Sequence, residues 1–492
     1  MTVVDHFIGG KAVANDFDES SIYNPSTGEK ISTVLHADIQ EVDLAVAAAK
    51  EALVGWSVSG LQKRADILLK AREILSSRAS EFVEIMMLEG GKTREDAMAE
   101  FGKGLEAIAY ASGVVSWYTT HLTRNVSGGI DTYDARFPIG VVGTVSPFNF
   151  PVMIPVIQSS MAIACGNTVV AKASEKVPTC LRKIAEVFKE AGLPDGVLNV
   201  INGDRVVVDR ILEHPDVAGV TFVGSTTVAK KVRVAGVAND KKVQAFGSGK
   251  NHMIVLPDAD MDMAADAAVS AAYGAAGQRC MAISVLVAVG DAADSLVEKI
   301  KERIPAVKTG PATTPGVQLG PVISRESKDR IHSFIASAEG EGAEVVVDGR
   351  DVEDEGYLVG ATLFDHVKPG MSVYDNEIFG PALSVVRVDT LEEAMEIAEQ
   401  HPLGNGAALF TRDGGVAREY VESVQAGMVG INIPIPVPTF SHSFGGWKDS
   451  AFTETKVTGP ESLSFYTRIK AVTTRWPDPA QSSVNLTFMS ED

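Results

Sequence analysis

The chain has 492 residues, of which 45% are hydrophobic and 22% are charged, a composition typical of a globular protein with roughly two to four domains. Its 64 acidic and 44 basic residues give a net charge of −20, which would repel a phosphate backbone and argues against nucleic acid as a partner. The three cysteines are too few for a disulfide framework and none stands in a CxxC spacing, which favours a reducing compartment.

The N-terminal segment, MTVVDHFIGGKAV, lacks the basic and apolar regions of a secretory signal and the arginine-rich pattern of a transit peptide. The most apolar segment, residues 151–165, is interrupted by Pro155 and Gln158 and is too short to span a bilayer. We therefore expect a cytoplasmic protein with no membrane partner.

Residues 38–122 show the periodicity of amphipathic helices. Asp38 and Glu41 stand in the spacing of a capping box, and apolar residues then recur at the i, i+3 and i+4 positions. The segments LQKRADILLKAREIL and EDAMAEFGKGLEAIAYASGVVSW continue the pattern, so we predict a helical region here.

From Pro138 onward, short apolar runs alternate with helical segments. Buried strands alternating with helices predict an α/β fold, with a parallel sheet covered by helices on both faces. The predicted strands cover residues 141–147, 167–174, 196–201, 218–225 and 242–246, and the predicted helices cover residues 152–164, 179–191, 206–213 and 226–237.

A second α/β region follows from Asn251 to about Ser450. Residues 465–476 then alternate in polarity as an edge strand would, and residues 477–492 have the composition of an acidic tail. The strands predicted in the second region cover residues 251–257, 283–290, 343–349, 382–388, 406–411 and 427–433.

A doubly wound sheet often binds a nucleotide, yet no GxGxxG motif follows any strand. The segment VTFVGSTTVAKKV instead places Ser225 where a strand gives way to a helix, and bare N–H groups at a helix start can bind a phosphate. The alternative is an ordinary connection with a capped helix. FGSGKNH is not a Walker loop, because Gln244 and Asn251 replace residues that this motif requires.

The strand-ending segment NTVVAKASEK supplies Lys172, Glu175 and Lys176. Open parallel sheets bind ligands at the carboxyl ends of their strands, and a lysine and a glutamate there can hydrogen-bond ribose hydroxyls. The alternative is a set of solvated charges at the start of the next helix.

Two further residues suggest acyl chemistry. Asn149 of SPFNFP can stabilise an oxyanion, although a turn-forming asparagine is the alternative. Cys280 of GAAGQRCMAIS is either a small core hydrophobe or a thiolate nucleophile favoured by Arg279 and nearby backbone N–H groups. The nine histidines show no metal-ligand spacing, so we expect no metal site.

Five motifs occur in the order and spacing of one known family: SPFNFP, AKASEK, FVGSTTVAK, AAGQRC and NEIFGP. On these motifs the chain resembles the aldehyde dehydrogenase superfamily over nearly its whole length. The segments GQRCMAIS, GKNHMIVLPDAD and GINIPIPVP are most similar to its CoA-acylating members, which act on malonate and methylmalonate semialdehydes.

The resemblance implies an aldehyde dehydrogenase-like α/β fold, in which a Rossmann-type NAD-binding domain faces an α/β catalytic domain across a cleft. It also implies a small β-extension for oligomerisation, and hence a homo-oligomer, either a dimer or a tetramer. The expected NAD-binding domain covers residues 1–119 and 139–250, the catalytic domain 251–450, the oligomerisation segments 120–138 and 451–480, and the tail 481–492.

Residue roles follow from the same resemblance. Cys280 is expected to be the nucleophile, and Asn149 to form an oxyanion hole with the backbone N–H of Cys280. Arg279 and Lys103 are expected to bind a substrate carboxylate, although the related enzymes carry a forked arginine where this chain has Lys103. The residues expected to bind NAD are Ser146, Phe148, Lys172, Glu175, Lys176, Ser225, Gly247 and Glu377.

The expected second half-reaction depends on Phe246, which stands where hydrolytic relatives carry a glutamate base. Water has a pKa of about 15.7 and an alkyl thiol one of about 8.5, so a thiol acceptor needs a base far less. We therefore expect NAD-dependent oxidation of malonate or methylmalonate semialdehyde with transfer of the acyl group to CoA and loss of carbon dioxide. The alternatives are a hydrolytic aldehyde dehydrogenase with another base and a catalytically silent relative.

Overall fold

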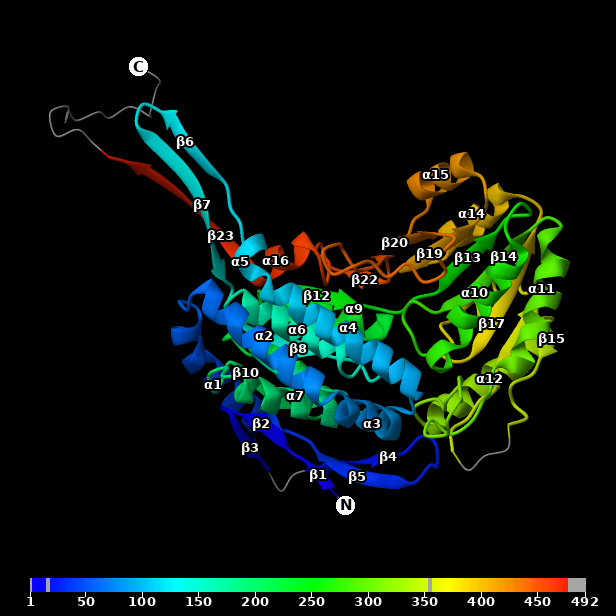
Figure 1. The fold of residues 1–492 in the computed structure, drawn as a ribbon, viewed down its shortest axis with the longest axis horizontal. Helices are drawn as coiled ribbons and strands as arrows, with labels where there is room; N and C mark the ends of the chain where they lie inside the picture. Colours follow the sequence, from blue (N-terminus) through cyan, green and yellow to red (C-terminus); the bar gives the residue numbers. More distant parts are fainter. Residues whose placement is uncertain (1, 15–17, 353–355, 477–492) are drawn as a thin grey trace.

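The computed structural model of the chain describes residues 2–14, 18–352 and 356–476. Two α/β lobes lie side by side, and a long three-stranded arm projects from the first lobe (Figure 1). In the described part of the chain, no helix combines the length and the apolar character needed to cross a lipid bilayer.

The helical region predicted for residues 38–122 is confirmed from Ile39 to Trp117, whereas Leu122 begins a strand. Helix α1 (Ile39–Trp56) begins with the predicted capping box, in which Asp38 accepts a hydrogen bond from the backbone N–H of Gln40 and Glu41 accepts one from that of Asp38. The helices that follow are α2 (Leu61–Ser77), α3 (Ala79–Gly90), α4 (Arg94–Ser112) and α5 (Val114–Trp117).

The sheet of the first lobe has eight strands in the order β22-β12-β11-β8-β9-β10-β2-β3. Its central strands are parallel and follow a Rossmann order, because the first of them, β8, lies between β9 and β11. The winding reverses between β8 and β11, which opens a crevice at their carboxyl ends. These central strands are the five predicted ones: β8 (Val141–Val145), β9 (Thr168–Lys172), β10 (Leu198–Ile201), β11 (Val217–Val223) and β12 (Lys242–Phe246).

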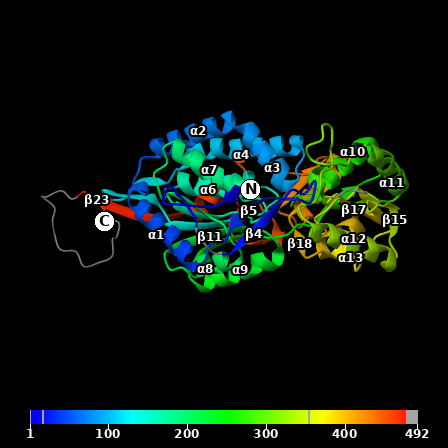
Figure 2. The same cartoon turned by 90° about the horizontal axis from the view of Figure 1, so that it is seen from below.

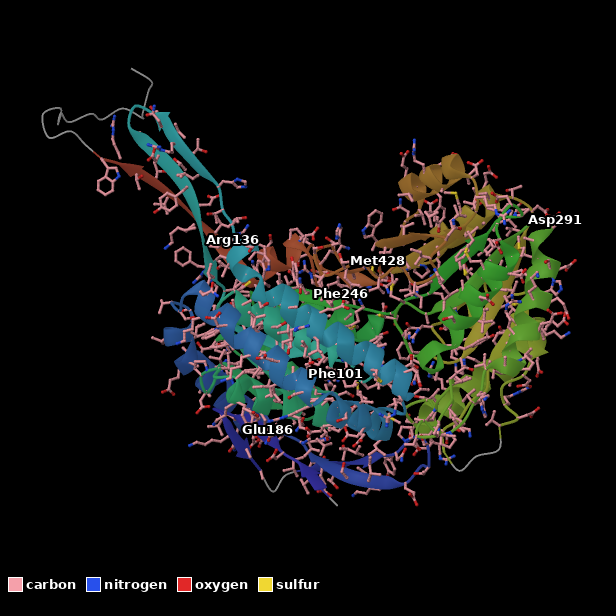
Figure 3. The ribbon with its side chains drawn as sticks, in the orientation of Figure 1. Phe101, Arg136, Glu186, Phe246, Asp291 and Met428 are labelled. Carbon is pink, nitrogen blue, oxygen red and sulfur yellow. The ribbon has the colours of Figure 1, made fainter. Side chains whose placement is uncertain are left out.

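Helices cover both faces of this sheet, as predicted (Figure 2). Helices α6 and α7 pack with α2, α3 and α4 on one face, and Phe101 lies in the apolar core of that layer (Figure 3). Helices α1, α8 and α9 cover the other face, in a second core that contains Val220. The bounds of the helices not yet given are α6 (Met153–Ala164), α7 (Thr179–Glu190), α8 (Arg205–Glu213) and α9 (Thr226–Ala238).

The second lobe is built on a seven-stranded sheet in the order β15-β16-β17-β14-β13-β19-β20, in which only the edge strand β15 is antiparallel to its neighbour. Six of these strands are the predicted ones, whereas β16 was not predicted. The strands are β13 (Asn251–Val255), β14 (Ile283–Val289), β15 (Glu344–Val347), β16 (Thr362–Asp365), β17 (Ala382–Val388), β19 (Gly406–Phe410) and β20 (Met428–Ile431).

Helices surround the second sheet and share its single large core. The longer helices are α10 (Met261–Tyr273), α11 (Ala292–Arg303), α12 (Arg325–Glu341), α14 (Leu391–Gln400) and α15 (Gly414–Ser423). Shorter elements are η1 (Gly274–Gly277), η2 (Ile304–Ala306), α13 (Ser372–Asp375), β18 (Leu403–Gly404), β21 (Trp447–Lys448), β22 (Ala451–Phe452) and α16 (Pro460–Tyr466).

The arm consists of β23 (Thr467–Arg475), β7 (Ile130–Pro138) and β6 (Leu122–Ser127), with β7 in the middle. The edge strand predicted near the C-terminus is confirmed, because β23 pairs along its length with β7 alone among the described strands. Arg136 marks the lower end of the arm in Figure 3. The expectation that these segments join copies of the chain stays a prediction.

Five short strands before α1 were not predicted. Strands β1, β5 and β4 form a small sheet, while β2 pairs with β10 and extends the main sheet to β3. Strands β1, β2 and β3 have three residues each, too few for an alternating pattern to stand out, and half or more of the residues in β4 and β5 are polar or charged. These strands are β1 (Thr2–Val4), β2 (His6–Ile8), β3 (Lys11–Val13), β4 (Glu19–Tyr23) and β5 (Lys30–Leu35); the predicted tail, residues 481–492, lies outside the described residues.

Candidate active site

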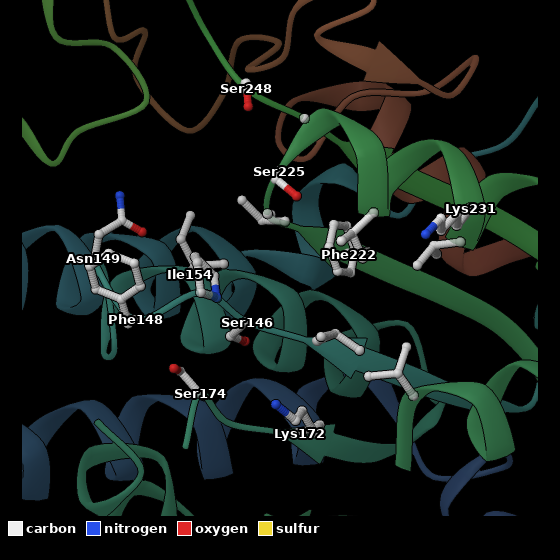
Figure 4. Close-up of a pocket in the computed structure, with 18 of the residues that line it drawn as sticks. Ser146, Phe148, Asn149, Ile154, Lys172, Ser174, Phe222, Ser225, Lys231 and Ser248 are labelled. Carbon is white, nitrogen blue, oxygen red and sulfur yellow. The ribbon is translucent and has the colours of Figure 1, made fainter. Parts of the chain in front are cut away.

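A cavity of about 1010 Å³ lies at the carboxyl ends of β8, β9 and β11, where the winding of the first sheet reverses. The first lobe contributes Asn149 and Lys172 to its wall, and the second lobe contributes Cys280 and Glu377. Figure 4 shows the part of this wall that the segments after the strands supply. The cavity therefore collects most of the residues that the sequence analysis selected.

The segment after β8 supplies two predicted cofactor residues. Ser146 is buried, and its hydroxyl donates a 3.0 Å hydrogen bond to Oε1 of Gln158. The ring of Phe148 meets that of Phe379 edge to face, with centroids 5.9 Å apart. Because Phe379 belongs to the second lobe, this ring contact joins the two sides of the cleft.

Asn149 lies beside the segment that carries the cysteine. Its Nδ2 donates a hydrogen bond of 2.9 Å to the carbonyl oxygen of Gln278, two residues before Cys280. The side chain is 8% exposed and lines the cavity (Figure 4). An asparagine that only forms a turn does not need a hydrogen bond to the other lobe. This hydrogen bond therefore favours a role for the Asn149 amide beside Cys280.

Lys172 and Glu175 form a pair at the end of β9. Their side chains are 3.1 Å apart, and the side chain of Lys172 is only 8% exposed, which argues against a simple solvated charge. Burial alone would raise the pKa of Glu175, but the charges of Lys172 and Lys176 and local hydrogen bonds hold this pKa below its ordinary value. The pair therefore offers an ionised acceptor and a cationic donor to the cavity.

Ser225 occupies the cap position of α9, but its hydroxyl makes no capping hydrogen bond. Ser225 therefore stands at the predicted cap position without capping the helix, and the first backbone N–H groups of α9 can bind other partners. The Thr226 N–H donates to the Ser248 hydroxyl at 3.3 Å, and the Ser248 N–H donates to the Thr226 hydroxyl at 3.0 Å. Both Ser225 and Ser248 line the cavity, so the start of α9 faces it (Figure 4).

Glu377 follows α13 and reaches the cavity from the second lobe. Its Oε1 accepts a 2.9 Å hydrogen bond from the Gly249 N–H. Burial raises the pKa of Glu377, although hydrogen bonds from Ser248 and Gly249 oppose this rise. The buried Lys250 donates a hydrogen bond to the carbonyl oxygen of Asn376, the residue directly before Glu377, and so supports the segment that carries Glu377.

The other two predicted cofactor residues differ from each other in position. Gly247 lines the cavity, and a Cβ there would lie 2.7 Å from Oγ1 and 2.9 Å from Cα of Thr226, so the close approach of α9 requires glycine. Lys176 is not part of the described cavity wall. Its Nζ lies 3.4 Å from the Ser324 hydroxyl and 5.9 Å from the centre of the Phe148 ring.

The Cys280 loop, residues 274–282, connects α10 with β14, as the flanking helix and strand patterns predicted. Ala275 and Ala276 have φ angles of 51° and 53°. This left-handed conformation costs about 1–2 kcal/mol for each non-glycine residue. Gly277 also has a positive φ of 68°, and any Cβ there would collide with the carbonyl oxygen of Gly380. Backbone strain of this kind is common at functional sites.

Cys280 is the cysteine that lines the cavity, whereas Cys165 and Cys180 are buried in the core of the first lobe. The core-hydrophobe alternative therefore describes those two residues and not Cys280. Burial, with the nearby charge of Glu377, raises the pKa of the Cys280 thiol to about 12, although backbone hydrogen bonds and Arg279 act in the opposite direction. Burial therefore outweighs the charge of Arg279 in its effect on this pKa, and the thiolate interpretation stays a prediction.

The two residues predicted to bind a substrate carboxylate lie away from this cavity wall. The Nη2 of Arg279 pairs with Asp96 of α4, and Arg279 lines a second cavity of about 800 Å³. Lys103 is exposed on α4, where its Nζ lies 2.7 Å from Oε2 of Glu106. The pairing of Arg279 with Asp96 was not predicted, because contacts across 183 residues leave no local pattern, whereas Lys103 and Glu106 are a local i, i+3 pair.

Phe246 ends β12 and is 6% exposed in the apolar core of the first lobe. Figure 3 shows it inside that lobe, and a Cβ at Gly445 would lie 2.9 Å from its ring. The position at which the resemblance leads us to expect the glutamate base of hydrolytic relatives is thus filled by a packed ring. The carboxylate residues in the described cavity wall are Glu175, Asp204, Asp209 and Glu377.

Several wall residues were not selected from the sequence. Arg330 and Phe334 come from one side of α12, and the Arg330 guanidinium donates to the Glu377 carbonyl oxygen at 3.3 Å. Their i, i+4 spacing predicts a shared helix face, but nothing local shows which face meets the other lobe. The remaining ones include Ser174, Phe222, Lys231 and Phe379.

Comparison with known proteins agrees with this arrangement. A malonate-semialdehyde dehydrogenase of Pseudomonas aeruginosa is 44% identical over 485 residues, which cover 98% of both chains. The crystal structure of a methylmalonate-semialdehyde dehydrogenase from Oceanimonas doudoroffii has a TM-score of 0.96 at 45% identity, covering 98% of this chain and 99% of the other. A Sinorhizobium meliloti protein solved in complex with NAD has the same TM-score at 44% identity and the same coverage of both chains.

The family model described as the aldehyde dehydrogenase family matches residues 13–472, which include the arm and both lobes around the cavity. With the Rossmann order of the first sheet and a cysteine on the wall between the lobes, this match shows that the chain belongs to the aldehyde dehydrogenase family.

Proposed function

We propose that this chain is an NAD-dependent, CoA-acylating dehydrogenase of malonate or methylmalonate semialdehyde, with acetyl-CoA or propionyl-CoA as the product. The observation that carries the proposal is the position of Cys280 on a cavity wall that also holds Asn149, Glu175 and Glu377. Family membership and the names of two similar enzymes support the reaction class and the substrate class.

The cavity residues fit NAD as the cofactor. Ser225 leaves the start of α9 open to a phosphate, while Lys172 and Glu175 offer partners for ribose hydroxyls, and Glu377 adds an acceptor near Cys280. The similar protein solved with NAD supports this assignment. The negative charge of Glu175 would repel a 2′-phosphate, which favours NAD over NADP.

In the proposed first half-reaction, the Cys280 thiol releases its proton to water and its sulfur forms a bond to the aldehyde carbon, while an electron pair of the carbonyl bond moves to the aldehyde oxygen. We propose that the Asn149 amide, which lies beside the Cys280 loop, and the backbone N–H of Cys280 stabilise the negative charge that develops on the aldehyde oxygen. NAD⁺, when bound, supplies the acceptor for the hydride that leaves the same carbon, and a thioester on Cys280 remains.

In the proposed second half-reaction, the CoA thiolate attacks the thioester carbonyl and the Cys280 sulfur leaves. Loss of the β-carboxylate as carbon dioxide leaves an electron pair on the α-carbon, which takes up a proton to give the acetyl or propionyl group. The packed ring of Phe246 supports a thiol acceptor over water, because no carboxylate stands at that position to activate water.

We also propose a compartment and an oligomeric state for the enzyme. It is expected to be a cytoplasmic homo-oligomer, either a dimer or a tetramer, joined through the arm of β6, β7 and β23. Apolar side chains exposed on the arm, including Val126, Phe137 and Ile469, support a surface that another copy covers. Sedimentation equilibrium tests the oligomer, and the dependence of sustained NADH formation on CoA tests the reaction.

A further inference from the structure

We propose that Asp96 positions the Cys280 loop by contacting it at two residues, Ala275 and Arg279, that precede Cys280. This inference rests on the proposal that Cys280 is the nucleophile. Asp96 lies in the first turn of α4, in the first lobe, whereas the loop belongs to the second lobe.

Asp96 contacts the loop at two points. Its Oδ2 accepts a 3.1 Å hydrogen bond from the backbone N–H of Ala275, and its Oδ1 accepts one from Nη2 of Arg279. One contact therefore holds the loop five residues before Cys280, and the other holds the residue directly before it. A single carboxylate thus spans the segment that leads to the sulfur.

Asp96 is itself fixed in place. The Thr93 hydroxyl caps α4 by accepting from the Asp96 N–H at 3.2 Å, and it donates to Oδ2 of Asp96 at 3.1 Å. Thr93 is buried, and the Asp96 side chain is only 13% exposed. A rigid helix start can hold a carboxylate more accurately than a mobile surface loop can.

The loop needs such external support because Ala275 and Ala276 both have left-handed backbone angles. The hydrogen bond from Ala275 to Asp96 falls on the first of these two residues. The other side chains that bind the loop backbone are the neutral amides of Asn149, Asn251 and Asn405. Among the described contacts to the loop, Asp96 supplies the carboxylate that neutralises Arg279.

Asp96 also lies outside the wall of the cavity proposed to bind NAD. It lines the second cavity, together with Gly274 and Arg279 of the loop. Loss of Asp96 should therefore disturb the placement of the sulfur and leave the cofactor site unchanged. This separation distinguishes a positioning role from a general loss of the site.

The test uses Asp96→Ala and Asp96→Asn. The matched control is Glu95→Ala, at an exposed residue of the same first turn of α4. The first-turnover burst of NADH is measured with malonate semialdehyde and NAD⁺ in excess over enzyme and without CoA, and NAD⁺ affinity is measured by titration. The rate constant reports the geometry around Cys280. The amplitude reports the fraction of sites that are folded, which is the quantity that a purely structural role would change.

We expect Asp96→Ala to lower the rate constant by on the order of 10²-fold at full amplitude, because small displacements of reacting groups have effects of this size. Asp96→Asn should lower it by on the order of tenfold, since the amide keeps an acceptor but loses the charge that pairs with Arg279. Glu95→Ala should stay within about twofold of the parent enzyme, as is usual for exposed substitutions. The NAD⁺ dissociation constant should change by less than about twofold in all three variants, because neither residue lines that cavity.

The proposal is overturned if both Asp96 variants keep the parent rate constant and lose only amplitude, since that is the signature of a structural role. It is also overturned if Glu95→Ala slows the reaction as much as Asp96→Ala does. If Asp96→Ala does not fold, the rate constant of Asp96→Asn decides by the same criterion. Failure of the reaction proposal is distinguishable from this outcome. In that case, NADH formation would survive in the Cys280→Ala variant.

Discussion

The Nδ2 of Asn149 donates a hydrogen bond across 2.9 Å to the carbonyl oxygen of Gln278, so a residue of the first lobe is tied to the loop that carries Cys280. A primary amide has two N–H donors, and this bond uses one of them. The same side chain can therefore fix the loop and present its second N–H to an oxygen at the reacting carbon. The relationship predicts a large effect of removing the amide.

Replacement of Asn149 by alanine should slow NADH formation by about 10²–10³-fold, the usual cost of losing one oxyanion donor. Stopped-flow measurement of NADH with saturating NAD⁺ gives the value. Asn239→Ala, at the exposed C-terminal end of α9, is the matched control and should retain the parent rate. A loss of less than about tenfold for Asn149→Ala would remove it from the oxyanion hole.

Cys280→Ala should abolish NADH formation while NAD⁺ binding survives, because the residues proposed to hold NAD lie on other segments of the wall. Activity assays and NAD⁺ titration of the same preparation test both parts. Cys165→Ala, in the core of the first lobe, provides the cysteine control and should keep its activity once folded. Turnover of Cys280→Ala near the parent rate would exclude it as the nucleophile.

Lys172→Met should weaken NAD⁺ binding by about 10- to 100-fold, since a hydrogen bond from a charged donor contributes about 1.5–3 kcal/mol. The maximal rate should change much less, because Lys172 lies at the end of β9 and not in the Cys280 loop. Lys183→Met, which breaks a half-exposed pair with Glu81, is the matched control. Equal NAD⁺ affinity for Lys172→Met and the control would place the ribose elsewhere.

The raised pKa of Cys280 predicts a specific pH dependence of its reactivity. Because burial raises this pKa to about 12, the thiolate fraction in the nucleotide-free protein should still be increasing throughout the neutral and mildly alkaline range. Alkylation of Cys280 by iodoacetamide, followed by peptide mass spectrometry, should accelerate by about tenfold per pH unit from about pH 7 to 9. A plateau that begins near pH 7 would instead reveal a resting thiolate.

Much of the fold was predictable because it depends on local patterns. The capping box at Asp38 and the five apolar runs of the first sheet are short-range signals, and each predicted element is present. Strand β16 and the five strands before α1 were missed, and for β1 and β2 the pairing partners lie 30 residues or more away in the sequence. Strand β2, for example, becomes part of the main sheet only through its pairing with β10.

The candidate site likewise contains some residues that were predictable from local motifs and others that were not. Asn149, Lys172 and Cys280 were selected from the motifs around them, and the fold brings all three to one cavity. The partner of Arg279 was not predictable, because Asp96 and Arg279 meet only after the two lobes come together. Lys103 was selected by its place in a motif, but the orientation of α4 leaves it on an exposed face with Glu106.

The dependence of turnover on CoA tests the proposed reaction most directly. With malonate semialdehyde and NAD⁺ alone, about one equivalent of NADH per active site should form quickly and then nearly stop, as expected when a covalent acyl-enzyme accumulates. Addition of CoA should restore steady NADH formation and release a CoA thioester that mass spectrometry detects. Equally fast steady turnover without CoA, with a free carboxylic acid as the product, would contradict the acylating reaction and identify a hydrolytic aldehyde dehydrogenase.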